Sequence, residues 1–360
     1  MTGTSLEQQL DSFDRAVRRA ALAELHAREL SGELAVAPPQ PVFNLHAHTF
    51  FSYNGAGYSP SHLAWRAHSQ GWWALGTVDF DVLDAVDETY AAGDLLGLRA
   101  SAGLETRVYV PELAAAEVNS PGEPGVLYLV GVGFPGSAAP APAAPVLADM
   151  RARAQARNRE MIARLNAYLS PVTVDLDQDV APLTPAGNVT ERHILVAYDA
   201  AARRHFPGRG ELVAFWAERL GMAPSAVDAM LSDEPYPHDA MRNKLMKRGS
   251  VGYAQPGPDT FPLLRTVAPA LSACGAVPTY AYLDGTSAAE SRLDELLALL
   301  LAQGIGGLTV IPDRNWNLRD AADKALKLAN LRQAMDLAEQ LDLPVVAGTE
   351  MNKPGQRELD

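Results

Sequence analysis

Short apolar segments alternate with amphipathic segments along most of this chain, and this alternation limits its fold more than any other feature. Each apolar segment has the length of a buried strand, and each intervening segment carries apolar residues at helical spacing. Strands are predicted at residues 42–45, 73–78, 99–103, 126–134, 276–282, 308–311 and 344–347. Helices are predicted between them at residues 59–69, 83–96, 262–274, 288–303 and 320–341. This order is typical of a parallel α/β barrel.

Three stretches interrupt the alternation and suggest how the chain is divided. Residues 1–40 carry an amphipathic helical pattern that ends at a group of prolines, so we expect a leader helix there. Residues 135–145 are rich in alanine, proline, glycine and serine, which is typical of a solvated linker. Residues 146–253 are mostly helical in pattern. We therefore expect a barrel in two parts, 41–134 and 254–360, with a helical insertion domain at 146–253.

The composition excludes several classes of protein. A formal net charge of -13 argues against bulk binding to nucleic acid or to anionic membranes, so an anionic substrate would need a local basic pocket. The single cysteine, Cys274, excludes a disulfide within the chain. No segment has the roughly 18 apolar residues that a membrane span needs, and we expect a cytoplasmic protein. The sequence leaves the oligomeric state open.

A His-x-His pair and three acidic residues are the candidates for chemistry. His46 and His48 alternate in a predicted strand, so both imidazoles point into the same volume and could chelate a divalent metal. Asp79, Glu105 and Glu350 follow other predicted strands, and the carboxyl ends of barrel strands converge on one site. A histidine pair in a strand is often no ligand, and any one acid could instead cap the next helix. The whole set together favours a metal site.

These residues resemble the motifs of the polymerase and histidinol phosphatase (PHP) family of metal-dependent phosphoesterases. His46 and His48 match the family's first motif, Asp79 the acid of its Thr-Asp-His, and Glu105 its Gly-Leu-Glu. Glu350, after Gly-Thr, takes the place of the aspartate in the terminal Gly-Ser-Asp-x-His. The resemblance implies an α/β fold, a distorted (β/α)7 TIM-like barrel with an inserted helical domain. It also implies hydrolysis of a small phosphorylated molecule or nucleotide.

Several of the family's histidines are replaced in this chain. Other residues stand at their positions: Phe80, Tyr128, Tyr282 and Asn352. Family members typically hold three metals, and only the site formed by His46, His48, Glu105 and Glu350 would keep all its ligands. The resemblance therefore predicts one divalent metal, Zn, Mn or Fe, rather than three. In that arrangement Asp79 is the candidate general base.

Two arginines near the predicted mouth of the barrel are candidates for binding the substrate. Arg107 lies two residues beyond Glu105 and could clamp a carboxylate or phosphate, or pair with Asp79 or Asp81. Arg314 belongs to a polar segment, 313–317, at a strand end, where it could serve function or simply a turn with a helix cap.

The predicted insertion holds three further candidates. Arg192 and His193 follow Thr190, which we expect to cap a helix, and they are similar to the Arg-Pro-His with which PHP enzymes of this kind reach the substrate phosphate. They lack the proline and could equally lie on a solvated helix face. Lys247 belongs to a basic cluster at 241–249 that could attract an anion or form a solvated surface.

Three functions remain compatible with these patterns. The first is a metal-dependent phosphoesterase acting on a small anionic substrate. The second is a mononuclear amide or ester hydrolase, because His-x-His and carboxylates serve that chemistry as well. The third is a non-catalytic ligand-binding protein on a decayed PHP scaffold, suggested by the replaced histidines.

Overall fold

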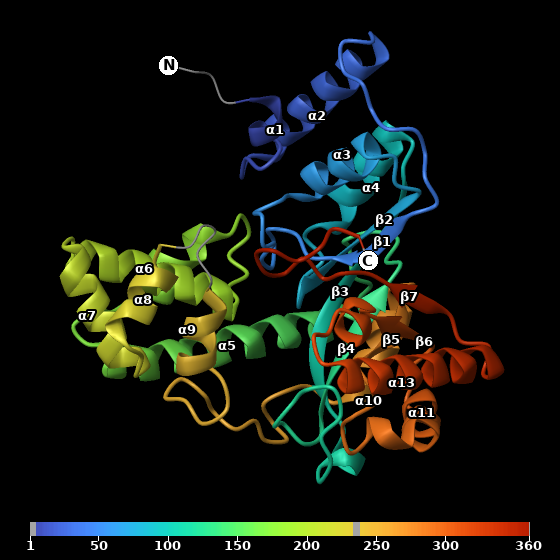
Figure 1. Ribbon diagram of the computed structural model, residues 1–360. Coiled ribbons are helices and arrows are strands. Elements are labelled where there is room, and N and C mark those ends of the chain that lie inside the picture. Colours follow the sequence, from blue (N-terminus) through green and yellow to red (C-terminus); the bar gives the residue numbers. More distant parts are fainter. Residues whose placement is uncertain (1–4, 233–237, 360) are drawn as a thin grey trace. The chain divides into compact units, whose positions relative to one another are not determined.

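The computed structural model describes residues 5–232 and 238–359, which belong to two compact units (Figure 1). The first unit runs to residue 151 and resumes at residue 257, and the second comprises Ala152–Pro256. Helix α5 (Ala144–Leu169) includes the point where the chain passes from the first unit to the second. Among the described residues, no helix is long and apolar enough to cross a membrane.

The first unit is built on a sheet of seven strands in sequence order. The strands are β1 (Phe43–Ala47), β2 (Ala74–Phe80), β3 (Arg99–Tyr109), β4 (Val126–Val132), β5 (Val277–Tyr282), β6 (Gly307–Val310) and β7 (Val345–Ala347). A parallel bridge joins Ala47, the last residue of β1, to Glu350, just beyond β7, so the sheet is nearly closed. The predicted α/β barrel is confirmed.

One strand departs from the parallel arrangement that the alternation predicts. β4 runs antiparallel to both β3 and β5, whereas the other neighbouring strands pair in parallel. A parallel partner needs a long crossover, usually a helix. The link between β3 and β4 contains only a short 3₁₀ turn, η1 (Pro111–Leu113), so β4 turns back beside β3.

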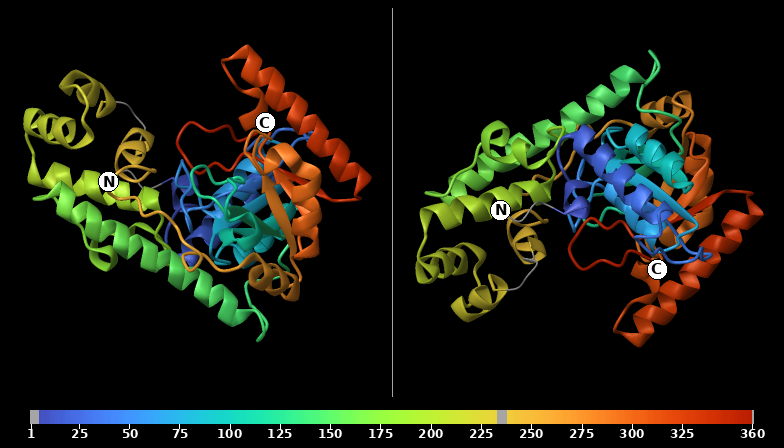
Figure 2. Two further views of the ribbon diagram at one scale, coloured as in Figure 1. Left: turned by 90° about the horizontal axis from the view of Figure 1, so that it is seen from below. Right: turned by 90° about the horizontal axis from the view of Figure 1, so that it is seen from above.

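Helices cover the outside of this sheet (Figure 2). They are α3 (Pro60–Ser69), α4 (Val86–Leu96), α10 (Leu264–Ala273), α11 (Leu293–Ala302), α12 (Asp313–Trp316) and α13 (Ala321–Gln340), with a 3₁₀ turn η4 (Glu290–Arg292). Leu104 and Leu129 of the strands form one core with Leu271 and Leu297 of the helices, and Cys274 is buried at its edge. This packing fixes the strand ends that hold the candidate site.

The leader segment forms two helices instead of the single helix predicted. α1 (Leu6–Gln9) ends before Asp14, whose side chain accepts a hydrogen bond from the backbone of Ala16 and starts α2 (Arg15–Leu30). A side-chain acceptor at the N-cap satisfies a backbone N–H that would otherwise lack a partner. Leu22 and Leu25 of α2 are buried in a core shared with Leu63 of α3, so the leader packs on the barrel.

The second unit is helical and has its own core. Besides most of α5, its elements are α6 (Glu191–His205), α7 (Arg209–Leu220), α8 (Pro224–Met230), α9 (His238–Leu245), the π turn η2 (Leu176–Val180) and the 3₁₀ turn η3 (Ala181–Leu183). Tyr198 and Trp216 are completely buried in that core. The unit can therefore hold its shape through its own contacts.

Candidate metal centre

The two strands at the barrel seam hold the His-x-His pair in place. The backbone N–H of His48 donates to the carbonyl of Glu350 at 2.7 Å, and the N–H of Glu350 donates to the carbonyl of His46 at 2.7 Å. Asn44 supports the same seam, because its side-chain oxygen accepts from the backbone of His46 and of Thr349. The candidate ligands at the ends of β1 and β7 therefore meet where the barrel closes.

Three ligand-type atoms gather around one point at this end of the barrel. His46 Nε2 and His48 Nε2 each lie 3.2 Å from Glu105 Oε2, the carboxylate oxygen of a β3 residue. All three side chains are buried. In tetrahedral coordination, metal–ligand distances of about 2.0–2.2 Å separate neighbouring ligand atoms by about 3.3–3.6 Å, which is close to the spacing found here. The spacing of these atoms thus fits a divalent cation as well as it fits hydrogen bonds.

The ring of His48 is held by a relay that also fixes its tautomer. Ser52 Oγ lies 3.1 Å from His48 Nδ1 and donates its only proton to Asp79 Oδ1 at 2.5 Å. Because the serine proton is already used, His48 Nδ1 must donate to Ser52 Oγ. The lone pair of the neutral ring is then on Nε2, which faces Glu105. Outer partners of this kind orient the imidazoles that bind metals.

Asp79 is saturated with hydrogen bonds from the loop after β1. Thr49 donates to it twice, through its backbone N–H at 2.8 Å and through Oγ1 at 2.6 Å, in addition to the bond from Ser52. Its side chain is fully buried. The carboxylate therefore orients the loop and the His48 ring, and its predicted part as general base stays a prediction.

His46 is less constrained than His48. Its Nδ1 is buried and has no hydrogen-bond partner among the described residues. A buried polar atom without a partner costs about 1–3 kcal/mol. The rings of the two histidines lie 5.4 Å apart, and Phe80 stacks on the ring of His48 at 4.5 Å. Phe80 therefore forms an apolar wall on one face of the His48 ring.

The electrostatics of this cluster keep Glu105 ionised. Burial by itself would raise the pKa of Glu105, but hydrogen bonds and charge interactions with His46 and His48 outweigh it and lower the pKa to about 2. Burial by itself would lower the pKa of His48, but the hydrogen bond and charge of Glu105 raise it above its ordinary value. The centre is therefore a place where a cation is favoured, whether it is a proton or a metal.

Glu350, the fourth predicted ligand, is engaged elsewhere. Its carboxylate accepts from Arg314 Nη2 at 2.6 Å and from Asn352 Nδ2 at 3.3 Å. Burial would raise the pKa of Glu350, but Arg314 lowers it below the ordinary value. Glu350 lies close enough to interact electrostatically with Glu105 and His46, but the compact group of ligand atoms consists of the other three residues. Its part in metal binding stays a prediction.

The two barrel arginines have different surroundings. Arg314 is half-exposed beside Glu350, and its charge also interacts with Glu105 and Tyr128. Arg107 donates to Glu123 at 3.1 Å and lies over the ring of Phe261 at 4.5 Å, and neither partner was expected from the sequence. Arg314 is therefore the cation that the structure places beside the cluster.

The candidates of the second unit are held by local contacts. Arg192 pairs with Asp239 at 3.0 Å, and both Arg192 and His193 are buried rather than set on a solvated face. Thr190 is the N-cap of α6, as predicted, and its backbone N–H donates to His193 Nδ1. Lys247 lies 3.7 Å from Glu191. A role for these residues in substrate binding stays a prediction.

Sequence reasoning missed Ser52, Thr49 and Asn44, which hold the candidate ligands in place. Each is a small polar residue within four positions of the histidine pair, and that proximity is the only signal the sequence offers. They act through hydrogen bonds to Asp79 and Thr349, which are distant in the chain.

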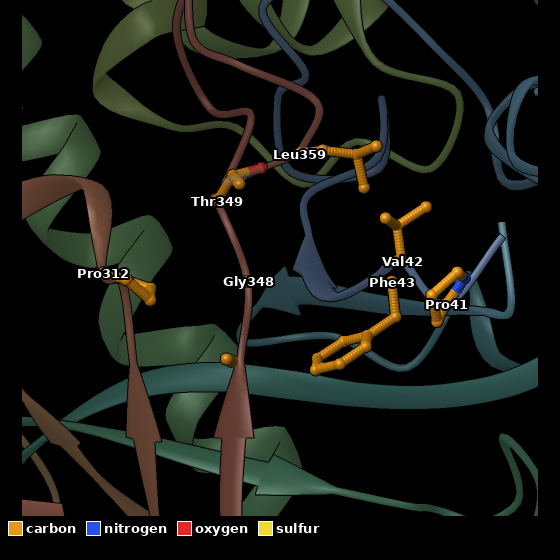
Figure 3. A pocket seen from close by; sticks show the side chains of 8 residues that line it. Pro41, Val42, Phe43, Pro312, Gly348, Thr349 and Leu359 are labelled. Atoms are coloured by element: carbon orange, nitrogen blue, oxygen red, sulfur yellow. The ribbon is translucent and has the colours of Figure 1, made fainter.

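A separate hollow lies beside the ends of β1 and β7 (Figure 3). Its lining residues are Pro41, Val42, Phe43, Pro312, Ala347, Gly348, Thr349 and Leu359. None of these side chains is an acid, a base or a common metal ligand, so the hollow adds no candidate for catalysis.

Comparison with known proteins supports the fold. No protein-family model matches this chain, and no curated protein matches it. Among solved structures, the chain is similar to a proposed metal-dependent phosphoesterase from Bifidobacterium adolescentis, with 20% identity, a TM-score of 0.55, and coverage of 90% of this chain and 94% of the other. It is also similar to an amidohydrolase from Chromobacterium violaceum, solved with bound sulfate and no metal. That match has 16% identity, a TM-score of 0.57, and coverage of 88% and 92%. The chain thus shares its α/β barrel fold with these two structures.

Proposed function

We propose that this protein is a divergent PHP-type hydrolase that binds one divalent metal through His46, His48 and Glu105 and cleaves a small phosphate ester. The observation that carries the proposal is the meeting of two imidazole nitrogens and one carboxylate oxygen at 3.2 Å in a buried site. The relay from His48 through Ser52 to Asp79 adds the ring orientation that metal-binding histidines need.

The replaced positions support one metal instead of three. A phenol with a pKa near 10 is a weak ligand beside imidazole. The hydroxyl of Tyr282 is buried, and its pKa is raised above the ordinary value, mainly by burial, which makes it a poorer ligand still. Asn352 is a hydrogen-bond donor to Glu350. Tyr282 and Asn352 are therefore better explained as structural residues around one metal centre than as ligands of two further metals.

Arg314 and Glu350 supply the means to receive an anion. Arg314 is half-exposed, and its guanidinium can bind a phosphate by two parallel hydrogen bonds. A substrate phosphate would compete with Glu350 for Arg314, which would leave the Glu350 carboxylate free to turn towards the ligand cluster. A divalent cation held by the cluster would supply Lewis-acid polarisation of the phosphoryl oxygen and an activated water.

The experiment combines metal analysis with a substrate panel. We expect one transition metal per chain that depends on His48, turnover of phosphate monoesters that stops on chelation, and loss of both that metal and the turnover in His48→Gln. His205→Gln, which changes an exposed histidine of α6, is the matched control and keeps both. Close to three metals per chain would contradict the single centre, and full metal with no turnover of any phosphoester would contradict the phosphatase.

A mononuclear amide or ester hydrolase is the second candidate. One Lewis-acid centre in a buried pocket can polarise a carbonyl as well as a phosphoryl oxygen, and the Chromobacterium violaceum neighbour is described as an amidohydrolase. Including amides and lactones in the panel separates the two functions. Tight binding of an anion with no turnover of either kind would favour the non-catalytic alternative.

A further inference from the structure

A second group of metal-type side chains lies where the leader helix α2 packs on α3. His26 Nδ1 is 3.0 Å from Glu29 Oε2, and His68 Nε2 is 2.7 Å from the same oxygen. All three side chains are partly buried, with between 16% and 20% of their surface exposed. Two imidazoles therefore converge on one carboxylate oxygen at the boundary between two helices.

This group is independent of the candidate metal centre. α3 connects the parallel strands β1 and β2, so it runs back from the carboxyl ends of the strands to their amino ends. His68 is in the last turn of α3 and thus lies towards the end of the barrel opposite His46 and His48. The two groups share no residue.

The packing of α2 on α3 holds the three side chains together. His26 and Glu29 are three residues apart and lie on one face of α2. Leu22 and Leu25 of the same helix are buried in a core shared with Trp65 of α3. The ring of His68 lies 5.9 Å from the ring of Trp65 and 6.0 Å from that of His26. The helices are therefore placed by apolar contacts that do not depend on any ion.

The donor set fits a metal better than an ordinary ion pair. A single carboxylate charge balances one imidazolium, yet here two imidazoles approach the same oxygen. Two histidines with one glutamate form a known zinc ligand set that leaves a fourth position open to water. The neighbouring pair His62 and Asp11, at 2.7 Å, shows the contrast, because there one imidazole meets one carboxylate.

We propose that His26, Glu29 and His68 bind a zinc ion that fastens the leader helix α2 to the barrel helix α3. With water as the fourth ligand, the ion would join residues of the leader to a residue 39 positions away in the barrel, as a cross-link would. Its nitrogen and oxygen ligands favour a late first-row divalent ion over magnesium or calcium. The site belongs to no step of the proposed hydrolysis.

The test uses the position of Trp65 as a local reporter. Cu²⁺ binds N and O sites at least as strongly as Zn²⁺ and quenches nearby tryptophan fluorescence. The chain has five tryptophans, so the signal is the difference between the full-length protein and its Trp65→Phe variant. We expect Cu²⁺ to quench the Trp65 emission and Zn²⁺ to compete with that quenching.

Substitutions locate the ion. His26→Gln and His68→Gln should each weaken Zn²⁺ competition by at least about 100-fold, since even the loss of an outer partner of a metal ligand costs 10–100-fold. His62→Gln, on the same helix, is the matched control and should change nothing. Circular dichroism verifies that each variant is folded.

Two results would overturn the proposal: no Trp65 quenching in the full-length protein, or quenching that survives in both His26→Gln and His68→Gln. Failure here leaves the one-metal hydrolase standing, because that centre shares no residue with this one. Conversely, an intact response in His48→Gln would show that the two sites act separately.

Discussion

Ser52→Ala is the sharpest test of the relay that orients His48. Ser52 is fully buried, accepts from His48 Nδ1 at 3.1 Å and donates to Asp79 at 2.5 Å. The alanine leaves the ring proton of His48 without its acceptor and removes one of the three bonds to Asp79. The ring is then free to turn or to change tautomer, so Nε2 no longer points reliably at the ligand cluster.

The magnitude follows from these contacts. A hydrogen bond to a charged group contributes about 1.5–3 kcal/mol, which is the expected loss in the free energy of unfolding. Loss of an outer partner weakens metal binding by about 10–100-fold, or about 1.4–2.8 kcal/mol. We expect both effects in Ser52→Ala, measured by urea denaturation of the metal-free protein and by chelator competition for Zn²⁺.

Ser61→Ala is the matched control for this experiment. Ser61 is also buried and donates to a carboxylate, Glu88 Oε1, at 2.8 Å, but it touches no imidazole. It should lose similar stability and keep the affinity for Zn²⁺ at the candidate metal centre. Equal Zn²⁺ affinity in Ser52→Ala and Ser61→Ala would refute the role of Ser52 in orienting His48.

Three further predictions concern the seam, the second unit and the leader. In Gly348→Ala the new Cβ would lie 2.3 Å from His46 N, so we expect a loss of more than about 3 kcal/mol in urea denaturation, whereas Gly136→Ala, with nothing nearer than 3.6 Å, stays neutral. Burial lowers the pKa of His193 to about 4 from 6.5, so the folded protein takes up this proton later than the unfolded chain as pH falls. The free energy of unfolding should therefore drop by about 3 kcal/mol between pH 6.5 and 4, and by less in His193→Gln. The measurement is denaturation of the second unit at a series of pH values. Arg18 is buried and bonded to Glu88, so Arg18→Met leaves the buried Glu88 carboxylate without its cation and should cost about 3–5 kcal/mol by thermal or urea unfolding.

Each of these has a result that would count against it. A Gly348→Ala protein as stable as Gly136→Ala would mean that the backbone at the β1–β7 seam can shift with little loss of stability. A pH profile identical in His193→Gln would assign the acid sensitivity to other groups. For the leader, an Arg18→Met protein that unfolds like the Arg28→Met control, which alters an exposed pair, would show that Glu88 is relieved in another way.

The sequence predicts the barrel because the information it needs is local. Strand and helix periods are set by residues two to four positions apart, and the predicted segments agree with the observed strands to within two residues, except that β3 runs six residues beyond its predicted end. The same two-residue period places His46 and His48 on one side of β1. The direction of β4 was beyond such reasoning, because it depends on how the short link after β3 folds.

Only the tertiary structure decided which donors pair with each of the candidate carboxylates. The sequence places Asp79, Glu105 and Glu350 at strand ends, but it does not show that Thr49 and Ser52 saturate Asp79 or that Arg314 holds Glu350. Each of those contacts joins residues far apart in the chain, and several donors compete for each carboxylate.

The alternation of strands and helices, and the histidine pair within it, thus determined the fold and the end of the barrel where chemistry is expected. Which carboxylate faces the imidazoles was settled by how the seven strands close, since closure brings Glu105 to 3.2 Å from both rings and leaves Asp79 to the loop. The meeting of His26, Glu29 and His68 was equally hidden from the sequence, because it arises only when α2 packs on α3. Periodicity is a property of neighbouring residues, whereas the contacts of a site form only when distant segments of the chain pack together.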